Sequence, residues 1–576
     1  MTNLMVNNLY NVVSLQSFTV FPEYFITLSI IYILIVITLI TYNSNGLMLQ
    51  KAVSECMALT LFMACYLILN DDLTSASYFM DILSFSNAVI YDSLASFTRF
   101  WLCFFSGLYF LFVADSLKEQ KLTSFEYLII ILFSVLGLLI MCSSNDLLLT
   151  YLAIELSSLA LYVLASFKKT SSYSVESGIK YFITGAVSSA FFLLGSSFIY
   201  GFTGSINFFD FYRMYNASIY DYVMVQWFPG IGYLPSFFFE SWLFSFSFRA
   251  SYARLIEVYD LTFDDLLFGY TIDYFNFVEI GLTLILFSLF IKLAAAPFHL
   301  WSLDVYEGSP TSSTIFFAVI TKLSILVVLI RLCHMAFFEI KEWWDFYFLS
   351  IGVFSIFVGS FGGLKQRKLK TLLAYSSTSH MGYILIAMGS DTFTGVQMAL
   401  VYMIIYMISS LCVWSILLFL RLKRKNITTK YNKELGDLAL LRKSNIPLSL
   451  ALSLTMFSIA GIPPLVGFLA KLGVFLPLII NSYYLPALAS IVFSVVSTFY
   501  YIRLIKVLYF ENILVGKLYY PINSEKTIIL SVLIFALIFL FCNPTLLYLA
   551  CYKISLALFV DPVTYSSLPI DYPFNK

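Results

Sequence analysis

Apolar runs of about 20 residues follow one another along almost the whole chain, and they restrict its fold more than any other feature. A helix of that length crosses the hydrocarbon core of a bilayer, which is about 30 Å thick. The chain is 60% hydrophobic and 11% charged, whereas soluble domains carry roughly 25% charged residues. The sequence therefore predicts an all-α polytopic membrane protein. We count about fourteen transmembrane helices, at 22–41, 52–70, 94–114, 124–142, 146–166, 178–201, 275–297, 312–333, 346–364, 371–389, 394–420, 447–478, 483–508 and 527–550.

An even number of spans places both termini on one side of the membrane, and successive loops alternate between the two sides. The charged residues of these loops are distributed unevenly between the sides. The basic segments 118–121, 365–370 and 421–425 fall on one side. Asp81 and Asp92 fall on the other side. The positive-inside rule assigns the basic loops to the matrix or cytoplasm. Both termini are then predicted to face the opposite compartment.

The segment 202–274 is the main irregularity in this pattern. It contains eight acidic residues and three arginines, and it is rich in Phe and Tyr. Either it is a surface insertion, or its aromatic side chains form a contact surface for a partner. No linker divides the chain, so we expect a single membrane domain over 1–576, with a core at about 94–508.

The cysteines and histidines give no pattern typical of a metal or redox centre. The eight cysteines are scattered without a CxxC pair, and there are only three histidines. That argues against a zinc site, an iron–sulfur cluster or a disulfide framework. We therefore expect no metal and no cofactor bound by this chain.

The first residues, MTNLMVNNLY, have no cationic flank, which is unlike a signal or transit peptide. A chain this hydrophobic is hard to import into an organelle after it has been synthesised elsewhere. We expect it to be made beside its own membrane, in a bacterium or inside an organelle.

Ionisable residues near the middle of a span are few. Lys471 is the only charged residue between Lys443 and Arg503. A charge at the centre of a membrane helix costs roughly 2.5–3.5 kcal/mol on insertion scales. Each could be a structural ion pair or a satisfied polar group, but together they favour a proton relay. The set is Glu155, Lys292, Lys322, Lys471 and His380.

Prolines interrupt two of the spans. Pro297 follows Lys292 in the seventh span, and Pro463 and Pro464 precede Lys471 in the twelfth. A proline frees a carbonyl from the helix, which a membrane tolerates only where the backbone faces protein or water. Two broken spans five apart suggest a five-helix unit used twice, as inverted copies.

Long motifs give the chain a resemblance to a known family over about residues 21–550. They closely resemble the family of subunit 2 of the mitochondrial proton-pumping NADH:ubiquinone oxidoreductase, respiratory complex I. The motifs are YLAIELSSLALYVLASFKK (151–169), ESGIKYFITGAVSSAFFLLGSSFIYGFTGS (176–205), FIKLAAAPFHLWSLDVYEGSPT (290–311), KTLLAYSSTSHMGYILI (370–386) and MFSIAGIPPLVGFLAKLGVF (456–475).

The resemblance implies an antiporter-like subunit with two inverted five-helix repeats and broken helices seven and twelve. It implies that Glu155 and Lys292 form a switchable ion pair, that Lys322 is the central proton carrier and that Lys471 leads to the exit. His380 and His299 are further candidates for the relay or its water chain. Flavin and iron–sulfur clusters are expected in other subunits.

Taken as a whole, the resemblance implies a subunit of the H⁺-translocating NADH:ubiquinone reductase that pumps protons without a redox centre of its own. The implied location is the inner mitochondrial membrane, with both termini and the 202–274 insertion on the intermembrane-space side. Expected partners are other membrane-arm subunits, including neighbouring antiporter-like ones, and membrane lipids, with no nucleic acid. The alternatives are a multisubunit cation/proton antiporter subunit and a scaffold that pumps nothing.

Overall fold

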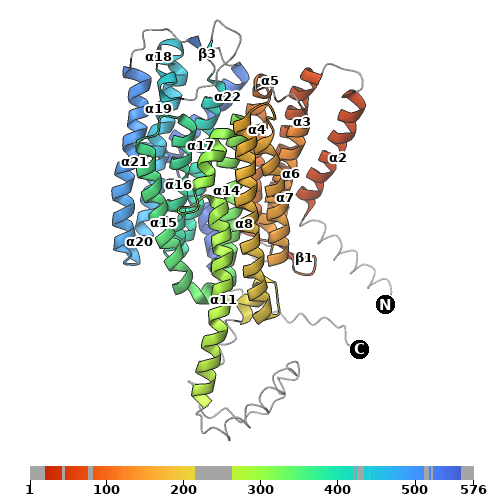
Figure 1. Cartoon of the computed structure of the whole chain (residues 1–576), viewed down its shortest axis with the longest axis vertical. Helices are drawn as coiled ribbons and strands as arrows, with labels where there is room; N and C mark the ends of the chain where they lie inside the picture. Colours follow the sequence, from red (N-terminus) through yellow and green to blue (C-terminus); the bar gives the residue numbers. More distant parts are fainter. Residues whose placement is uncertain are drawn as a thin grey trace.

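Long helices run side by side across the molecule and form one bundle (Figure 1). The computed structural model describes residues 20–41, 46–74, 82–120, 122, 124–214, 263–420, 422–423, 434–439, 441–511, 518–519 and 523–559. Most of the predicted insertion at 202–274 lies outside these residues. The helices are α2 (Phe21–Thr41), α3 (Gly46–Thr74), α4 (Ser93–Val113), α5 (Ser116–Glu119), α6 (Glu126–Ser143), α7 (Leu147–Ser166), α8 (Ser172–Thr203), α11 (Phe263–Leu293), α12 (Leu300–Gly308), α13 (Thr311–Val319), α14 (Thr321–Ile330), η1 (Arg331–Ala336), η2 (Phe338–Ile340), α15 (Lys341–Leu364), α16 (Leu369–Met388), α17 (Phe393–Phe419), η3 (Leu435–Leu438), α18 (Leu441–Ser444), α19 (Ile446–Ala460), α20 (Val466–Ile480), α21 (Tyr484–Phe510), α22 (Ser524–Cys542) and α23 (Thr545–Phe559).

The predicted membrane spans agree with these helices. In the described part of the chain, eleven helical segments are long and apolar enough to cross a membrane. Together with α11/α12, α16 and the pair α19/α20, they account for the fourteen predicted passes. The predicted end of the last span is wrong, because α22 stops at Cys542 and Pro544 cannot continue the helix. The residues beyond it form the separate helix α23.

Two small antiparallel strand pairs lie at opposite ends of the bundle, and the first of them is a hairpin. Strands β1 (Ile82–Ser84) and β2 (Val89–Tyr91) pair antiparallel, as do β3 (Leu422–Lys423) and β4 (Leu518–Tyr519). Helices α5 and α18 share one end with β3, and β1 lies at the other end (Figure 1). Lys423 of β3 and Lys443 of α18 therefore lie at the same end of the bundle.

The centre of the molecule is formed by the eighth and eleventh passes. The segment Thr311–Ala336 and helix α17 are each buried over their whole most apolar window. By contrast, α8, α21 and α22 bury less than a third of theirs and present large apolar side chains at the periphery. Lipid is the natural environment for such a surface.

A repeated helix contact supports the five-helix repeat. A Cβ on Gly137 of α6 would lie 2.8 Å from the Ser157 backbone nitrogen of α7, so only glycine fits there. A Cβ on Gly359 of α15 would lie 2.8 Å from the Ser379 backbone nitrogen of α16. Both residues of the second contact lie 222 positions after those of the first. A unit of five passes ends on the opposite side from where it starts, so the second copy is inverted.

Both predicted helix breaks are present. Helix α11 ends at Leu293, and the chain passes Pro297 before α12 starts. Helix α19 ends at Ala460, where Gly461 takes a φ of 83° that favours glycine. Pro463 and Pro464 follow before α20 begins.

The eighth pass is interrupted as well, although it contains no internal proline. Helix α13 gives way to α14 at Ile320, and the π-helical turn η1 follows α14. The Thr321 hydroxyl donates to the Phe317 carbonyl at 2.9 Å, close to this discontinuity. Such side-chain bonds to the preceding turn often bend helices. The sequence did not predict this third irregular pass.

Candidate functional site

Lys322 lies in the first turn of α14, at the centre of the bundle. Only 3% of its surface is exposed. Its Nζ donates to the Tyr406 hydroxyl at 3.2 Å and lies 5.2 Å from the centroid of that ring. The Tyr406 hydroxyl in turn donates to the Ala318 carbonyl at 3.0 Å. In the described part of the chain, Lys322 has no carboxylate within ion-pairing distance, so it can exchange a proton without breaking an ion pair.

Lys471 lies at the second helix break. Its Nζ donates to the Ala460 carbonyl at 2.6 Å. That carbonyl is one of the four that a helix end leaves without an internal partner. The ammonium also lies 5.5 Å from the centroid of the Tyr383 ring. The break therefore supplies the oxygen that holds this lysine, which explains why the two occur together.

His380 lies between these two lysines. Its Nδ1 is 2.7 Å from the Tyr402 hydroxyl, and its Nε2 is 3.4 Å from the Tyr501 hydroxyl. Its ring centroid lies 5.5 Å from that of Tyr406 and 6.4 Å from that of Tyr383. These two tyrosines are the ones that contact Lys322 and Lys471.

We call Lys322, Tyr406, His380, Tyr383 and Lys471 the central row. Each member is buried, and each contacts the next through a hydrogen bond, a tilted ring contact or an ammonium over a ring. The sequence identified the two lysines and the histidine but missed the tyrosines. A signal was present, because Tyr402 and Tyr406 are four residues apart and share one face of an apolar helix.

Lys292 lies in the last turn of α11, where the negative end of the helix dipole favours a cation. A cavity of about 30 Å³ lies beside it, lined also by Ser158, Tyr162 and Thr321. That volume suits one water molecule. The cavity therefore extends from the seventh pass to α14, which carries Lys322.

Glu155 lies on α7, the helix that forms one wall of this cavity. Its charge acts on Lys292, but among the described residues the two do not form a direct ion pair. The Glu155 Oε1 atom is buried without a hydrogen-bond partner. The two groups are neighbours, while the predicted pairing stays a prediction.

His299 lies in the first helix break, after Pro297. Its Nδ1 is buried without a partner, and its ring centroid is 6.1 Å from that of Tyr375. None of its described contacts joins it to the central row. Across the residues that the structure places, no three His, Cys, Asp or Glu side chains are grouped as metal ligands would be.

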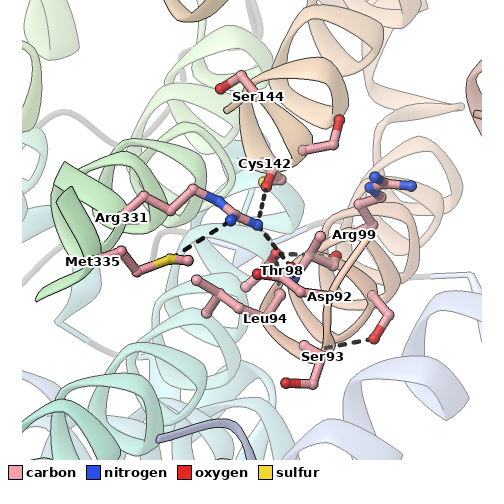
Figure 2. A network of polar contacts seen from close by, with 12 residues as sticks. Asp92, Ser93, Leu94, Thr98, Arg99, Cys142, Ser144, Arg331 and Met335 are labelled. Carbon is pink, nitrogen blue, oxygen red and sulfur yellow. Dashed lines mark hydrogen bonds and ion pairs between the residues drawn. The ribbon is translucent and has the colours of Figure 1, made fainter. Parts of the chain in front are cut away.

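Two buried ion pairs were missed in the sequence. Arg331 of η1 donates to Asp92 at 2.8 Å and to the Cys142 carbonyl at 3.1 Å, which joins the eighth pass to α4 and α6 (Figure 2). Arg99 lies 3.4 Å from Glu23, and both are buried. Both arginines fall inside predicted spans, which was the available signal. An arginine does not lose its proton in proteins, so these pairs hold helices together.

A family model matches the chain over residues 144–251 and 260–498. Its description is "NADH:quinone oxidoreductase/Mrp antiporter, TM". The match includes Glu155, Lys292, Lys322, His380 and Lys471, and therefore both helix breaks.

Curated relatives match over most of their length. NADH-ubiquinone oxidoreductase chain 2 of Marchantia polymorpha is 36% identical over 82% of this chain and 85% of its own. NADH-quinone oxidoreductase subunit N of Pelagibacter ubique is 35% identical over 86% of this chain and 89% of its own.

A chain of respiratory complex I from Thermus thermophilus has a similar structure. Its TM-score is 0.67 at 22% identity, and the match covers 92% of this chain and 99% of that one. At this level of identity the likeness shows a shared fold.

Proposed function

Because the chain belongs to the NADH:quinone oxidoreductase/Mrp antiporter transmembrane family, we propose that it is a proton-translocating membrane subunit of respiratory complex I. Its role is to couple electron transfer from NADH to quinone, on other subunits, to proton movement through the membrane. The central row carries this proposal, since it joins two buried lysines through ionisable and hydroxyl groups.

In the proposed relay, Lys322 is the central carrier and His380 connects it to Lys471. Lys471 is the last lysine of the row and leads towards the exit. A lysine that bonds to a hydroxyl or a carbonyl keeps that contact as either ammonium or amine, because both forms have N–H donors. The contacts at Tyr406 and Ala460 therefore suit groups that change protonation state.

Glu155 and Lys292 are proposed to be the gate at the other end. When they approach, each stabilises the charge on the other, and when they separate, Lys292 can pass its proton on. The structure holds them as neighbours without a direct pair, and the cavity beside Lys292 leaves room for one water on the way to Lys322. His299 is proposed as a further water-chain residue at this break.

The proposal extends to the surroundings of the subunit. The membrane is proposed to be the inner mitochondrial membrane, with both termini on the intermembrane-space side and the gene in the organelle. Neighbouring antiporter-like subunits and lipids are its partners. Flavin and iron–sulfur clusters are assigned to other subunits of the complex.

The second candidate function is a subunit of a multisubunit cation/proton antiporter, which the family description also covers. Both curated relatives described above are NADH-dependent oxidoreductase subunits at 35–36% identity, which favours complex I. Copurification decides between the two, because only complex I contains flavin- and iron–sulfur-bearing subunits.

The relay is tested with Glu155→Gln and Lys471→Met in the intact complex, reconstituted in vesicles. Each should lower proton uptake and coupled NADH:quinone activity, because the variant side chain cannot take up and release the proton. The matched control is Lys169→Met, since Lys169 is exposed. If both variants assembled and pumped like the parent, the relay assignment would be wrong.

A further inference from the structure

Asp345 and Asp391 lie near one another at the end of the bundle away from α5 and α18, since Lys341 pairs with Asp391 and is four residues before Asp345 on α15. The eighth pass starts near α5, where the Gln120 amide donates to the Thr311 hydroxyl at 2.8 Å. It therefore ends on the opposite side, where α15 begins. Asp345 is in the second turn of α15, and Asp391 is in the turn between α16 and α17. Neither residue belongs to the relay described above.

Asp345 is 6% exposed, and its Oδ1 has no hydrogen-bond partner. Asp391 has a φ of 49° and a side chain that is 15% exposed. One of its oxygens lies 2.9 Å from the Lys341 ammonium, while the other has no partner. The charges of the two aspartates act on one another.

The ion pair with Lys341 explains why Asp391 is held in its turn. It does not explain Asp345, whose buried Oδ1 accepts no hydrogen bond. Asp391 therefore has a counter-charge in Lys341, whereas Asp345 is buried with an oxygen that accepts no hydrogen bond. The groups that face Asp345 are Lys341 and Glu342 on α15, Asp391 on the α16–α17 turn, Tyr483 after α20, and Cys333 on η1.

The same two helices that carry the end of the central row lead to this pair. Helix α16 carries Tyr383 and ends just before Asp391. Helix α20 carries Lys471, and Asn481, the residue after α20, donates to the Ser390 carbonyl. Ten residues separate Lys471 from Asn481, which corresponds to a rise of about 15 Å along α20.

We propose that Asp345 and Asp391 form the proton-release site of this subunit. The inference rests on the proposed function and names the group that receives the proton from Lys471. An N–H bond of the Lys471 ammonium breaks, water molecules carry the proton across the roughly 15 Å between the two sites, and an O–H bond forms on Asp345, which passes the proton to Asp391. The partly exposed Asp391 then gives the proton to the aqueous side, and no electrons move.

The test uses Asp345→Asn in the intact reconstituted complex, with proton yield per NADH and infrared difference spectra as readouts. Loss of a carboxyl C=O band, together with a reduced proton yield, is expected. Asp345→Glu keeps a carboxyl group and should retain both signals, which separates proton exchange from a packing defect. The control is Glu126→Gln, because Glu126 is an exposed acid in the first turn of α6, at the opposite end of the bundle.

The experiment distinguishes failure of the proposed release site from failure of the proposed relay. If Lys471→Met abolishes pumping while Asp345→Asn leaves the proton yield and the infrared spectrum unchanged, the release site is wrong and the relay stands. If neither variant changes the yield, the proposed function fails too.

Discussion

Two buried arginines and two buried lysines of the bundle differ in their partners, although the further buried lysine Lys526 pairs with Asp115 at 2.9 Å. The buried arginines Arg331 and Arg99 are matched with carboxylates. The buried lysines Lys322 and Lys471 bond to a hydroxyl and a carbonyl. A guanidinium stays charged at any accessible pH, whereas an amine can give up its proton. At these four positions, the arginines therefore form fixed ion pairs, and the lysines are the groups proposed to carry protons.

Replacing Arg331 by Met should destabilise the subunit by about 3–5 kcal/mol, because Asp92 is left buried and unpaired. The measurement is the thermal or denaturant stability of the purified complex. Adding Asp92→Asn should recover part of the loss, since Asn can still accept the Ala95 N–H that caps α4. An exposed pair provides the control: Glu55→Gln, which removes the partner of Lys51, should cost about 0–1 kcal/mol. If Arg331→Met alone is as stable as the parent, the Arg331–Asp92 pair does not hold these helices together.

At the scale of elements, the helix breaks position the lysines. Lys292 ends the helix that stops at the first break, and Lys471 reaches back to the helix that stops at the second. Lys322 begins α14, directly after the third discontinuity. In each case the broken backbone leaves carbonyls that a continuous helix would have used itself. The breaks therefore create polar sites inside the membrane next to the three lysines of the proposed relay.

Gly461→Ala tests the second break. A Cβ at this position would lie 2.8 Å from the Lys471 side chain, and the φ of 83° is unfavourable for alanine by roughly 1 kcal/mol. Lys471 should be displaced from the Ala460 carbonyl, and proton pumping by the assembled complex should fall. Gly436→Ala is the control, because a Cβ there meets nothing within 4 Å. Equal pumping by the two variants would show that this contact is dispensable.

The spans and the buried lysines could be predicted because each leaves a local signal. Length and hydropathy define a span, and Lys471 stands out as a single charge in a long apolar stretch. The tyrosines of the central row gave a weaker signal, since aromatic residues are common throughout this chain. The partners of Arg331 and Arg99 depend on which helices become neighbours. Asp92 is 239 residues away from Arg331 in the chain, so no local pattern could pair them.

At the scale of the whole molecule, the proposed relay lies where the bundle is most shielded from lipid. Lys322 lies on the eighth pass and Tyr406 on the eleventh, and these are the two passes with fully buried apolar windows. The proposed gate at Glu155 and Lys292 belongs to the first five-helix unit, and Lys471 belongs to the second. The central row thus joins the two inverted copies through the core of the protein.

The most direct test of this relay is the number of protons translocated per NADH by the complex with Lys322→Met, at matched amounts of assembled complex. Lys322 is the first member of the central row, so its loss interrupts transfer while Glu155, Lys292 and Lys471 remain. A lower proton yield than that of the exposed-site control Lys169→Met is predicted. An unchanged proton yield, with Lys322 replaced and the complex intact, would contradict proton transfer through the central row.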